Sequence, residues 1–410
     1  MAVYTPSSWS ASRAAAFSDT MMLDGSFLKK VSALAAFFCL SAGPLPTHAQ
    51  SCIAPGQWAM PAASGARIVS PSEVVDAARE ARFVLLGEDH DNPDHHRWQL
   101  HSLGMLLGAR GKLVIGMEML PRRAQPVLDR WVAGDIGEAQ LLRETQWNKV
   151  WRFDAELYLP IFHFARLHRL PLIALNVDRG LVRDVGGKGW KAIPPAQREG
   201  VSDPAPPSTE YREHLRGWFE QHRRAEEPDD PAAFERFVEA QLTWDRAFAE
   251  ALAQAAARDP EALVVGIIGS GHLRNGHGVP HQLRALRAGI AKIWLPVTPD
   301  VPCGELTAGL ADAVFAIAGA RADDTPKLGV LLDEESEGLR VRAVVAGSVA
   351  ESAGVKAGDR VLTAAGLRVA SAEDLIALIR RQPPGTWLPL KVQRSGRELE
   401  LVAKFPPAAE

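Results

Sequence analysis

Histidines gather in two short windows of the sequence. Of the twelve histidines in the chain, four lie in residues 90–101 and three lie in residues 272–281. Each window directly follows an apolar run, and each is entered through a Gly-x-x-His pattern that ends at His90 or at His272. An imidazole titrates near neutral pH, and it is also a common ligand for transition metals. The two windows therefore predict acid–base or metal chemistry, provided that the fold brings them together.

Acidic and amide residues beside the two windows extend the candidate site. Glu88 lies within the first Gly-x-x-His pattern, and Glu118 follows the apolar run Leu113–Met117. By the same logic Asn176 follows an apolar run, and Asp245 lies on an expected helix. Two histidines with one or two carboxylates suit a transition metal with an open position, and the same groups can supply a general acid and base. The candidate catalytic residues are Glu88 and Glu118, and the candidate metal ligands are His90, His272, Glu88 and Glu118.

A structural role is the alternative for each of these residues taken singly. His95 and His96 fall in the first turn of an expected helix, where one of them could face solvent, and His101 falls on the surface of the same helix. Glu88 could cap neighbouring backbone, and the glycines could serve tight turns alone. Two Gly-x-x-His loops that follow strands at equivalent positions are harder to explain in this way, which favours a functional site.

The elements that must position these residues alternate between strands and helices. Ser70-Pro71-Ser72-Glu73 is a capping box that predicts a helix as far as Ala81, and Asn92-Pro93 and Val279-Pro280 each open another helix. This alternation predicts an α/β fold with a largely parallel sheet flanked by helices. In such a sheet the residues after the strands line the ligand crevice, so the two windows can converge. The expected strands are Phe83–Leu86, Leu113–Met117, Leu172–Leu175, Leu263–Ile268 and Ile293–Val297, and the expected helices include Asp94–Leu107, Ala155–His168 and Ala232–Ala257.

Composition limits the classes of partner. A chain of 410 residues is too long for one compact core, which favours at least two domains. Its 47% hydrophobic and 23% charged residues and its formal net charge of −3 are those of an ordinary globular protein. That balance gives no electrostatic reason to expect a nucleic acid as partner. Among the three cysteines, Cys52 and Cys303 could pair in an oxidising compartment.

The N-terminus has the pattern of a secretory signal peptide. Lys29-Lys30 precede an apolar run from Val31 to Leu45, and a small residue, Ala49, follows shortly after. No later stretch approaches the roughly 20 apolar residues of a membrane-spanning helix. Residues 1–49 are therefore expected to be a signal peptide. Ala49-Gln50-Ser51 before Cys52 lacks the leucine of a lipobox, so we expect a periplasmic protein that is soluble rather than a lipoprotein.

A change in amino-acid composition after Pro299 predicts a second domain. We expect an irregular segment at 50–67, an α/β domain at 68–299, a linker rich in small residues at 300–326 and a small α+β domain at 327–405. The stretch Ala353-Gly-Val-Lys-Ala-Gly-Asp359 resembles bacterial PDZ domains. That resemblance implies β-augmentation, in which a strand edge pairs with a peptide and backbone N–H groups capture its carboxylate. The alternative is a PDZ-like unit that serves only dimerisation or packing. The expected peptide-binding residues are Leu328, Gly329, Val330 and Leu331.

Residues 68–297 resemble the ChaN-like haem-binding uptake family of the Tiki/TraB superfamily. The motifs that carry the resemblance are Leu86-Gly-Glu-Asp-His90 with His95, His96 and Gln99, Gly116–Met119, Tyr158–Ile161, Ala174–Asn176 and Gly269–Pro280. The resemblance implies an exported haem- or iron-binding protein with a role in haem iron uptake. It also implies association with the outer membrane and haem binding by a homodimer.

The resemblance also implies a haem site. In that family a tyrosine holds the iron, helped by a histidine of the partner subunit. Tyr158 matches the family's segment, whereas Tyr211 lies in the Pro-rich excursion 193–231. A phenolate can ligate ferric haem, and the alternative is that Tyr158 packs a helix against the sheet with its hydroxyl hydrogen-bonded. The expected haem-contacting residues are Tyr158, His95, His96, Arg274 and His277.

The wider superfamily offers a second interpretation. It includes proteins that resemble metal-dependent peptidases and esterases, and the paired Gly-x-x-His site would then hold a divalent transition metal. Whether the chain is an enzyme stays open at this point. A third interpretation makes the first domain an inactive scaffold and the PDZ unit the working part.

Overall fold

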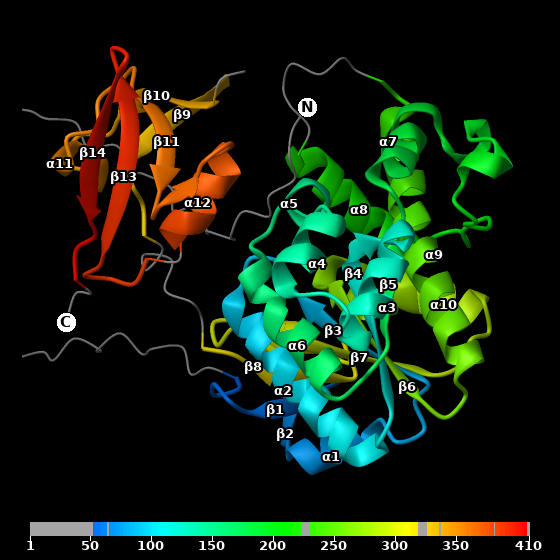
Figure 1. Cartoon of the computed structure of the whole chain (residues 1–410). Coiled ribbons are helices and arrows are strands. Elements are labelled where there is room, and N and C mark those ends of the chain that lie inside the picture. The colour runs from blue at the N-terminus through cyan, green and yellow to red at the C-terminus, as the bar shows by residue number, and fades with distance from the viewer. Residues whose placement is uncertain are drawn as a thin grey trace, which may run out of the picture. The chain divides into compact units, whose positions relative to one another are not determined.

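The computed structural model describes residues 52–63, 65–222, 230–318, 326–335, 338–380 and 382–407. They form an α/β domain and a smaller β-rich domain (Figure 1). The expected signal peptide, residues 1–49, lies outside these ranges. Within them, no helix combines the length and apolarity that a membrane crossing requires.

A sheet of eight strands in the described ranges forms the centre of the α/β domain, in the order β2-β1-β8-β7-β3-β6-β4-β5. Every pairing from β8 to β5 is parallel, and β1 is antiparallel to both β2 and β8. The expected fold class is confirmed. The strands are β1 (Trp58–Ala62), β2 (Gly65–Val69), β3 (Phe83–Glu88), β4 (Leu113–Pro121), β5 (Leu172–Asn176), β6 (Leu263–Gly269), β7 (Ala291–Val297) and β8 (Ala313–Ala316).

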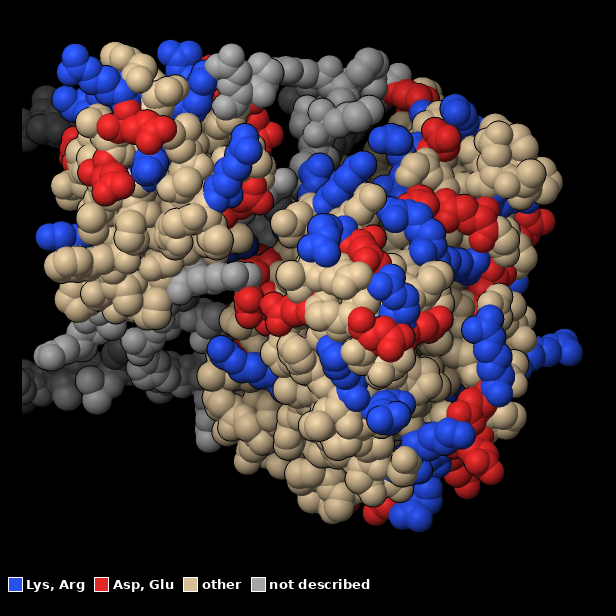
Figure 2. All heavy atoms as spheres, viewed as in Figure 1, with Lys and Arg blue, Asp and Glu red and all other residues tan. Residues whose placement is uncertain are grey.

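Helices cover both faces of this sheet, which explains why its central strands are mainly apolar. On β3, Val84 and Leu86 pack into one core with α2, α3 and α6, whereas Phe83 and Leu85 pack into the other with α7, α9 and α10. Acidic and basic side chains are interspersed over the face of the molecule that Figure 2 shows. The helices are α1 (Pro71–Ala77), α2 (Pro93–Arg110), α3 (Gln125–Ala133), α4 (Glu138–Glu144), α5 (Trp147–Val150), α6 (Leu159–Leu167), α7 (Arg179–Lys188), α8 (Thr209–His222), α9 (Ala233–Arg258) and α10 (Val279–Ala285).

Local caps fix where the helices near the site begin. The predicted capping box is present at α1, where Ser70 and Glu73 each satisfy the other's backbone N–H. That helix ends at Ala77, four residues before the predicted Ala81. At α2 the Asn92 side chain accepts hydrogen bonds from the backbone of Asp94 and His95. The cap holds the first turn of α2 directly after the loop that leaves β3.

The α/β domain extends beyond its expected boundaries, 68–299, in both directions. Residues 50–67, expected to be irregular, contain β1, and residues 300–326, expected to be a linker, contain β8. These two strands pair with each other at Trp58 and Phe315. A disulfide joins Cys52 to Cys303 beside them. Both strands are short, and β1 contains a proline, a residue that is uncommon inside a sheet.

The excursion 193–231 is also more ordered than expected. It contains α8, whose Tyr211 and Leu215 pack against Phe234 and Leu242 of α9. This small core is separate from the two cores of the sheet and places α8 beside the long helix.

The second domain has its own core and an open sheet edge. Its strands follow the order β14-β13-β11-β10-β9, so β9 has a neighbour on one side only within the described residues. Gly329 precedes β9 with φ +82° and approaches Ser348 so closely that a side chain would clash. Asp359 of the motif is buried, and the Arg394 guanidinium holds it with two bonds of 2.6 and 2.7 Å. The elements are β9 (Val330–Glu335), β10 (Gly338–Val344), α11 (Val349–Ser352), β11 (Arg360–Ala364), β12 (Leu367–Arg368), α12 (Ala372–Arg380), β13 (Trp387–Arg394) and β14 (Arg397–Lys404).

Candidate functional site

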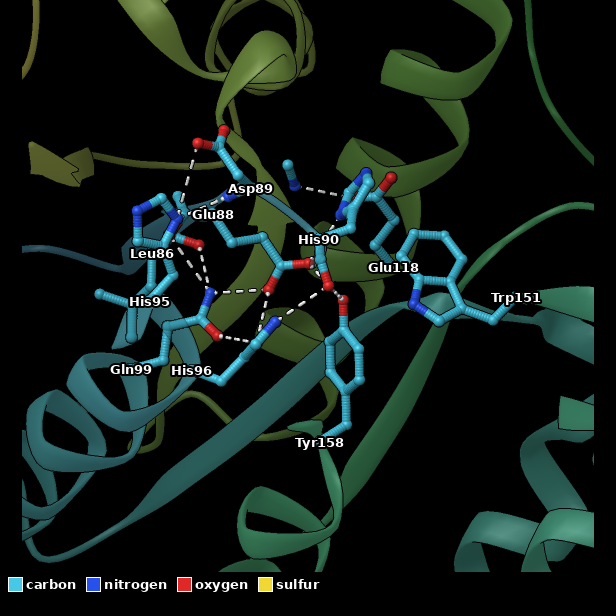
Figure 3. A network of polar contacts seen from close by, with 12 residues as sticks. Leu86, Glu88, Asp89, His90, His95, His96, Gln99, Glu118, Trp151 and Tyr158 are labelled. Atoms are coloured by element: carbon cyan, nitrogen blue, oxygen red, sulfur yellow. Dashed lines mark hydrogen bonds and ion pairs between the residues drawn. The ribbon is translucent and has the colours of Figure 1, made fainter. Parts of the chain in front are cut away.

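Glu88 is the centre of a buried polar network at the end of β3 (Figure 3). Its Oε1 accepts hydrogen bonds of 2.8 Å from the Tyr158 hydroxyl and from Nδ1 of His90. Its Oε2 accepts a bond of 2.9 Å from the Gln99 side-chain amide. A carboxylate that is only 1% exposed needs such partners, because burial without them would be costly.

The network holds Glu88 and His90 as an ion pair. Burial would raise the pKa of Glu88, but attraction to His96 and the hydrogen bond from His90 lower it to about 2. Burial would lower the pKa of His90, but the hydrogen bond to Glu88 and the charge of Glu118 raise it to about 9. At neutral pH the pair is therefore a carboxylate and an imidazolium.

His95 and His96 face inward from the first turn of α2. Both are buried, at 4% and 3% exposure. Nε2 of His96 lies 3.1 Å from the His90 carbonyl oxygen, and Nδ1 of His95 accepts a 2.7 Å bond from the backbone N–H of Asp89. The expectation that one of them faces solvent is wrong. Together they fix the loop that carries His90.

Tyr158 is enclosed by the same network. Its side chain is fully buried, and its ring contacts the rings of His96, Trp147 and Trp151. Burial, followed by the charge of Glu88, raises the pKa of the hydroxyl well above its ordinary value. A phenolate is therefore disfavoured here. Of the two interpretations drawn from the sequence, the geometry matches the one in which Tyr158 packs a helix against the sheet with its hydroxyl hydrogen-bonded.

A second network of the same composition surrounds His272. Its Nδ1 lies 2.6 Å from Oδ1 of Asp245, and the Tyr211 hydroxyl donates to Oδ2 of that carboxylate at 2.9 Å. Asp245 and Tyr211 are buried, and although burial lowers the pKa of His272, the charge of Asp245 raises it overall. Each histidine is thus paired with a carboxylate that also accepts a tyrosine hydroxyl. Asp245 was among the residues expected near the site, but Tyr211 was not, because nothing in the excursion 193–231 indicated a helix that packs on α9.

Glu118 lies between the two networks. Its Oε2 accepts a 2.6 Å bond from the backbone N–H of Gly269, and its charge raises the pKa of both His90 and His272. A side chain on Gly269 would place its Cβ 2.8 Å from the His90 ring, so only glycine fits there. The Asn176 side chain donates to the Glu118 carbonyl at 2.9 Å. The two Gly-x-x-His loops do converge, as the strand pattern predicted.

The remaining expected haem residues lie on the Asp245 side. The His277 ring stacks on Tyr211, with ring centres 5.3 Å apart. The charge of Arg274 lowers the pKa of His214 on α8, although burial is the larger cause. Tyr158, His95 and His96 belong to the Glu88 network instead. The structure therefore divides the expected haem set between the two networks.

The expected metal ligands are close together but are engaged with other groups. Across the described ranges, no group of three or more His, Cys, Asp or Glu side chains is placed to hold a metal ion. Nδ1 of His90 and of His272 each face a carboxylate, and Glu118 is bound to backbone. What the arrangement can do chemically is hold protons on two histidines that are each paired with a carboxylate.

The expected peptide-binding residues surround the start of β9. Leu328 is buried in the core of the second domain, whereas Leu331 is 48% exposed. The Gly329 carbonyl accepts from the Val345 N–H, which fixes the turn that leads to Val330. The edge of β9 itself is the part of this region that is open to pairing within the described residues.

The family is shown by a match over the α/β domain. The family described as "Haem-binding uptake, Tiki superfamily, ChaN" matches residues 74–283, more than half of the chain. The chain belongs to this family. A PDZ domain matches residues 340–394. Both expected resemblances are confirmed.

Solved structures resemble parts of the chain. "Cofacial heme binding to ChaN of Campylobacter jejuni" is 18% identical, covers 63% of this chain and 96% of that chain, and has a TM-score of 0.51, which shows a shared fold for the ChaN-like domain. A serine endoprotease from Yersinia pestis is 21% identical over 21% of this chain and 30% of its own, with a TM-score of 0.19. The HtrA3 PDZ domain bound to a phage-derived ligand is 18% identical, over 19% of this chain and 83% of its own, with a TM-score of 0.18. No curated protein sequence matches the chain.

Proposed function

We propose that this protein binds haem outside the cytoplasm and serves haem iron uptake. The observation that carries the proposal is the family match, which spans the α/β domain from α1 to α10. The ChaN structure of the same fold is described as binding haem cofacially. Haem would supply a coordinating iron, an apolar face and carboxylate side chains that need partners in the protein.

Tyr158 does not fit as the residue that holds haem iron. It has no exposed surface, and its hydroxyl donates to Glu88. Ligation would require a phenolate beside that carboxylate, in an environment where the pKa of the hydroxyl is already raised. The iron ligand is therefore a different residue.

Hemin titration of the purified protein tests haem binding. We expect a shifted Soret band that saturates in the micromolar range, with hemin in buffer as the control. Size-exclusion chromatography before and after hemin addition reports whether binding is linked to a homodimer. A Soret band identical to that of hemin in buffer would refute the proposal.

An extracytoplasmic location is part of the proposal. Two observations support it, namely the signal-peptide pattern at 1–49 and the Cys52–Cys303 disulfide, since disulfides persist mainly in oxidising compartments. Fractionation of cells that express the full chain should recover it from the periplasm, whereas a cytoplasmic pool with reduced cysteines would contradict the location. Release by osmotic shock, without detergent, would argue against attachment to the outer membrane.

We further propose that the PDZ domain captures the C-terminus of a partner protein. The edge of β9 offers backbone groups for pairing, and the turn at Gly329 precedes it. Peptides with a free carboxylate should bind the full chain, and their amidated forms should not. Equal binding of both forms would refute capture of a carboxylate.

Paired acid–base groups favour a second candidate function, that of a hydrolase. Glu88–His90 and Asp245–His272 are two acid–base pairs, and the charge of Glu118 raises the pKa of both histidines, which suits proton transfer to and from a substrate. In this candidate His90 and His272 would hold a divalent metal, which would activate a water molecule. Ester and peptide turnover should then fall at least about 100-fold in His90→Asn. Metal analysis and turnover before and after chelation decide whether a metal takes part, and an inert wild-type protein would exclude this candidate.

A further inference from the structure

Two open cavities adjoin on the outer face of α2, away from the buried networks. Their volumes are about 480 and 640 Å³, within the range of small-molecule sites. Arg97 and His101 line both cavities, so these two side chains stand at the border between them. They lie four residues apart on one helix and therefore share a face. Both residues are exposed.

The walls of the two cavities are mainly apolar and aromatic. Trp98 and Phe315 line the first cavity, from α2 and β8, and Met105 and Phe164 line the second, from α2 and α6. Trp98 packs on Phe315 in nearly parallel planes, with an interplanar angle of 21°. Apolar walls with one imidazole and one guanidinium at their border suit a flat, largely apolar molecule that carries a metal and a carboxylate.

Arg97 can change its partner at little cost. Its ion pair with Asp94 is 2.7 Å long, but the Arg97 side chain is 76% exposed. Exposed pairs of this kind contribute little to stability. A ligand carboxylate can therefore take the guanidinium, and such pairs are geometrically specific because two parallel N–H groups can bind it.

We propose that haem lies across these two cavities, with His101 as the iron ligand and Arg97 as the partner of a haem carboxylate. This rests on the proposed haem-binding function and assigns the site that Tyr158 does not fit. The imidazole of His101 is exposed and lies between two apolar walls, whereas the Tyr158 hydroxyl is buried and bonded. Neither His101 nor Arg97 was among the residues expected from the sequence.

The test compares hemin with metal-free protoporphyrin on matched variants of the full chain. His101→Ala should weaken hemin binding at least about tenfold and change the Soret and magnetic circular dichroism spectra, but should leave metal-free protoporphyrin binding unchanged. Arg97→Ala should weaken both ligands, because both carry the same carboxylates. The controls are His163→Ala on α6 and Arg79→Ala, which breaks an ion pair whose arginine is as exposed as Arg97, and they should change neither.

A rescue experiment separates ligation from any structural effect. In His101→Gly, added imidazole should occupy the space of the lost side chain and restore the wild-type spectrum with bound hemin. Tyr158→Phe should keep that spectrum. A wild-type spectrum in His101→Ala, or its loss in Tyr158→Phe alone, would overturn the assignment while leaving haem binding intact. If the wild-type protein bound no hemin at all, the proposed function would fail as well.

Discussion

Two buried carboxylates carry the chemistry of the candidate site, and each is held by a histidine and a tyrosine. Glu88 accepts from His90 and Tyr158, and Asp245 accepts from Tyr211 and faces His272. The tyrosine hydroxyl orients the carboxylate, and the carboxylate in turn fixes which ring nitrogen of the histidine faces inward. The other ring nitrogen of each histidine is the one left for binding or for proton transfer.

Removing either tyrosine hydroxyl should destabilise the fold. We expect Tyr158→Phe and Tyr211→Phe each to lower the free energy of unfolding by about 1–3 kcal/mol, because a buried charged acceptor loses one donor. Urea unfolding followed by tryptophan fluorescence measures the change. If both variants were as stable as the wild type, the hydroxyls would not bond to the carboxylates in solution.

The ion pair between Glu88 and His90 should make stability depend on pH in two directions. The pKa of Glu88 is lowered from 4.5 to about 2, so its contribution is full above pH 4.5 and is lost as the pH falls through 2. The pKa of His90 is raised from 6.5 to about 9, so its contribution is full below pH 6.5 and is lost as the pH rises through 9. The pair therefore stabilises most between pH 4.5 and 6.5.

Denaturant unfolding of the wild type and of His90→Gln between pH 4.5 and pH 9 measures how much the ion pair contributes to stability. The difference in unfolding free energy should be largest near pH 6 and should shrink toward pH 9. An NMR titration of the His90 ring gives an independent value, and a midpoint near 6.5 would contradict the ion pair.

At the scale of elements, the apolar central strands and the capped helices were predictable from sequence. β3, β4, β5, β6 and β7 were expected because strands buried on both faces are continuous apolar runs. Strands β1 and β8, which pair with each other inside the sheet, were missed because they are short and are stabilised by Trp58 and its aromatic neighbours. Convergence of the two histidine loops was expected because both follow strands of a parallel sheet, whereas the contact between α8 and α9 that places Tyr211 is a tertiary one.

The cap of α2 positions the histidines of the Glu88 network. Asn92→Ala should lower the free energy of unfolding by about 0.5–2 kcal/mol, because two backbone N–H groups lose their acceptor. Asn92→Asp keeps an acceptor oxygen and should be close to wild type. Denaturant unfolding compares the two, and equal losses in both variants would mean that the side chain acts in another way.

At the scale of the whole molecule, the Cys52–Cys303 disulfide joins the start of the α/β domain to the segment before β8. Cys303→Ser should lower the free energy of unfolding by about 2–5 kcal/mol, since the cross-link constrains a long loop in the unfolded chain. Cys52→Ser and the double variant should show the same loss. A reductant should destabilise the wild type and leave all three variants unchanged, and a wild type indifferent to reductant would contradict the bond.

The same cross-link decides how the α/β domain would bear mechanical tension. It connects residues 251 positions apart, so nearly all of this domain lies inside a covalent ring. A pull applied between Cys52 and the PDZ domain passes through the sulfur atoms and bypasses that ring. Outside the ring, β8 is the element of the α/β domain that carries the load, and it would detach from β1 and β7 while both histidine networks stay unstretched. If a partner bound to the PDZ domain pulled on the chain, the candidate site would therefore stay intact.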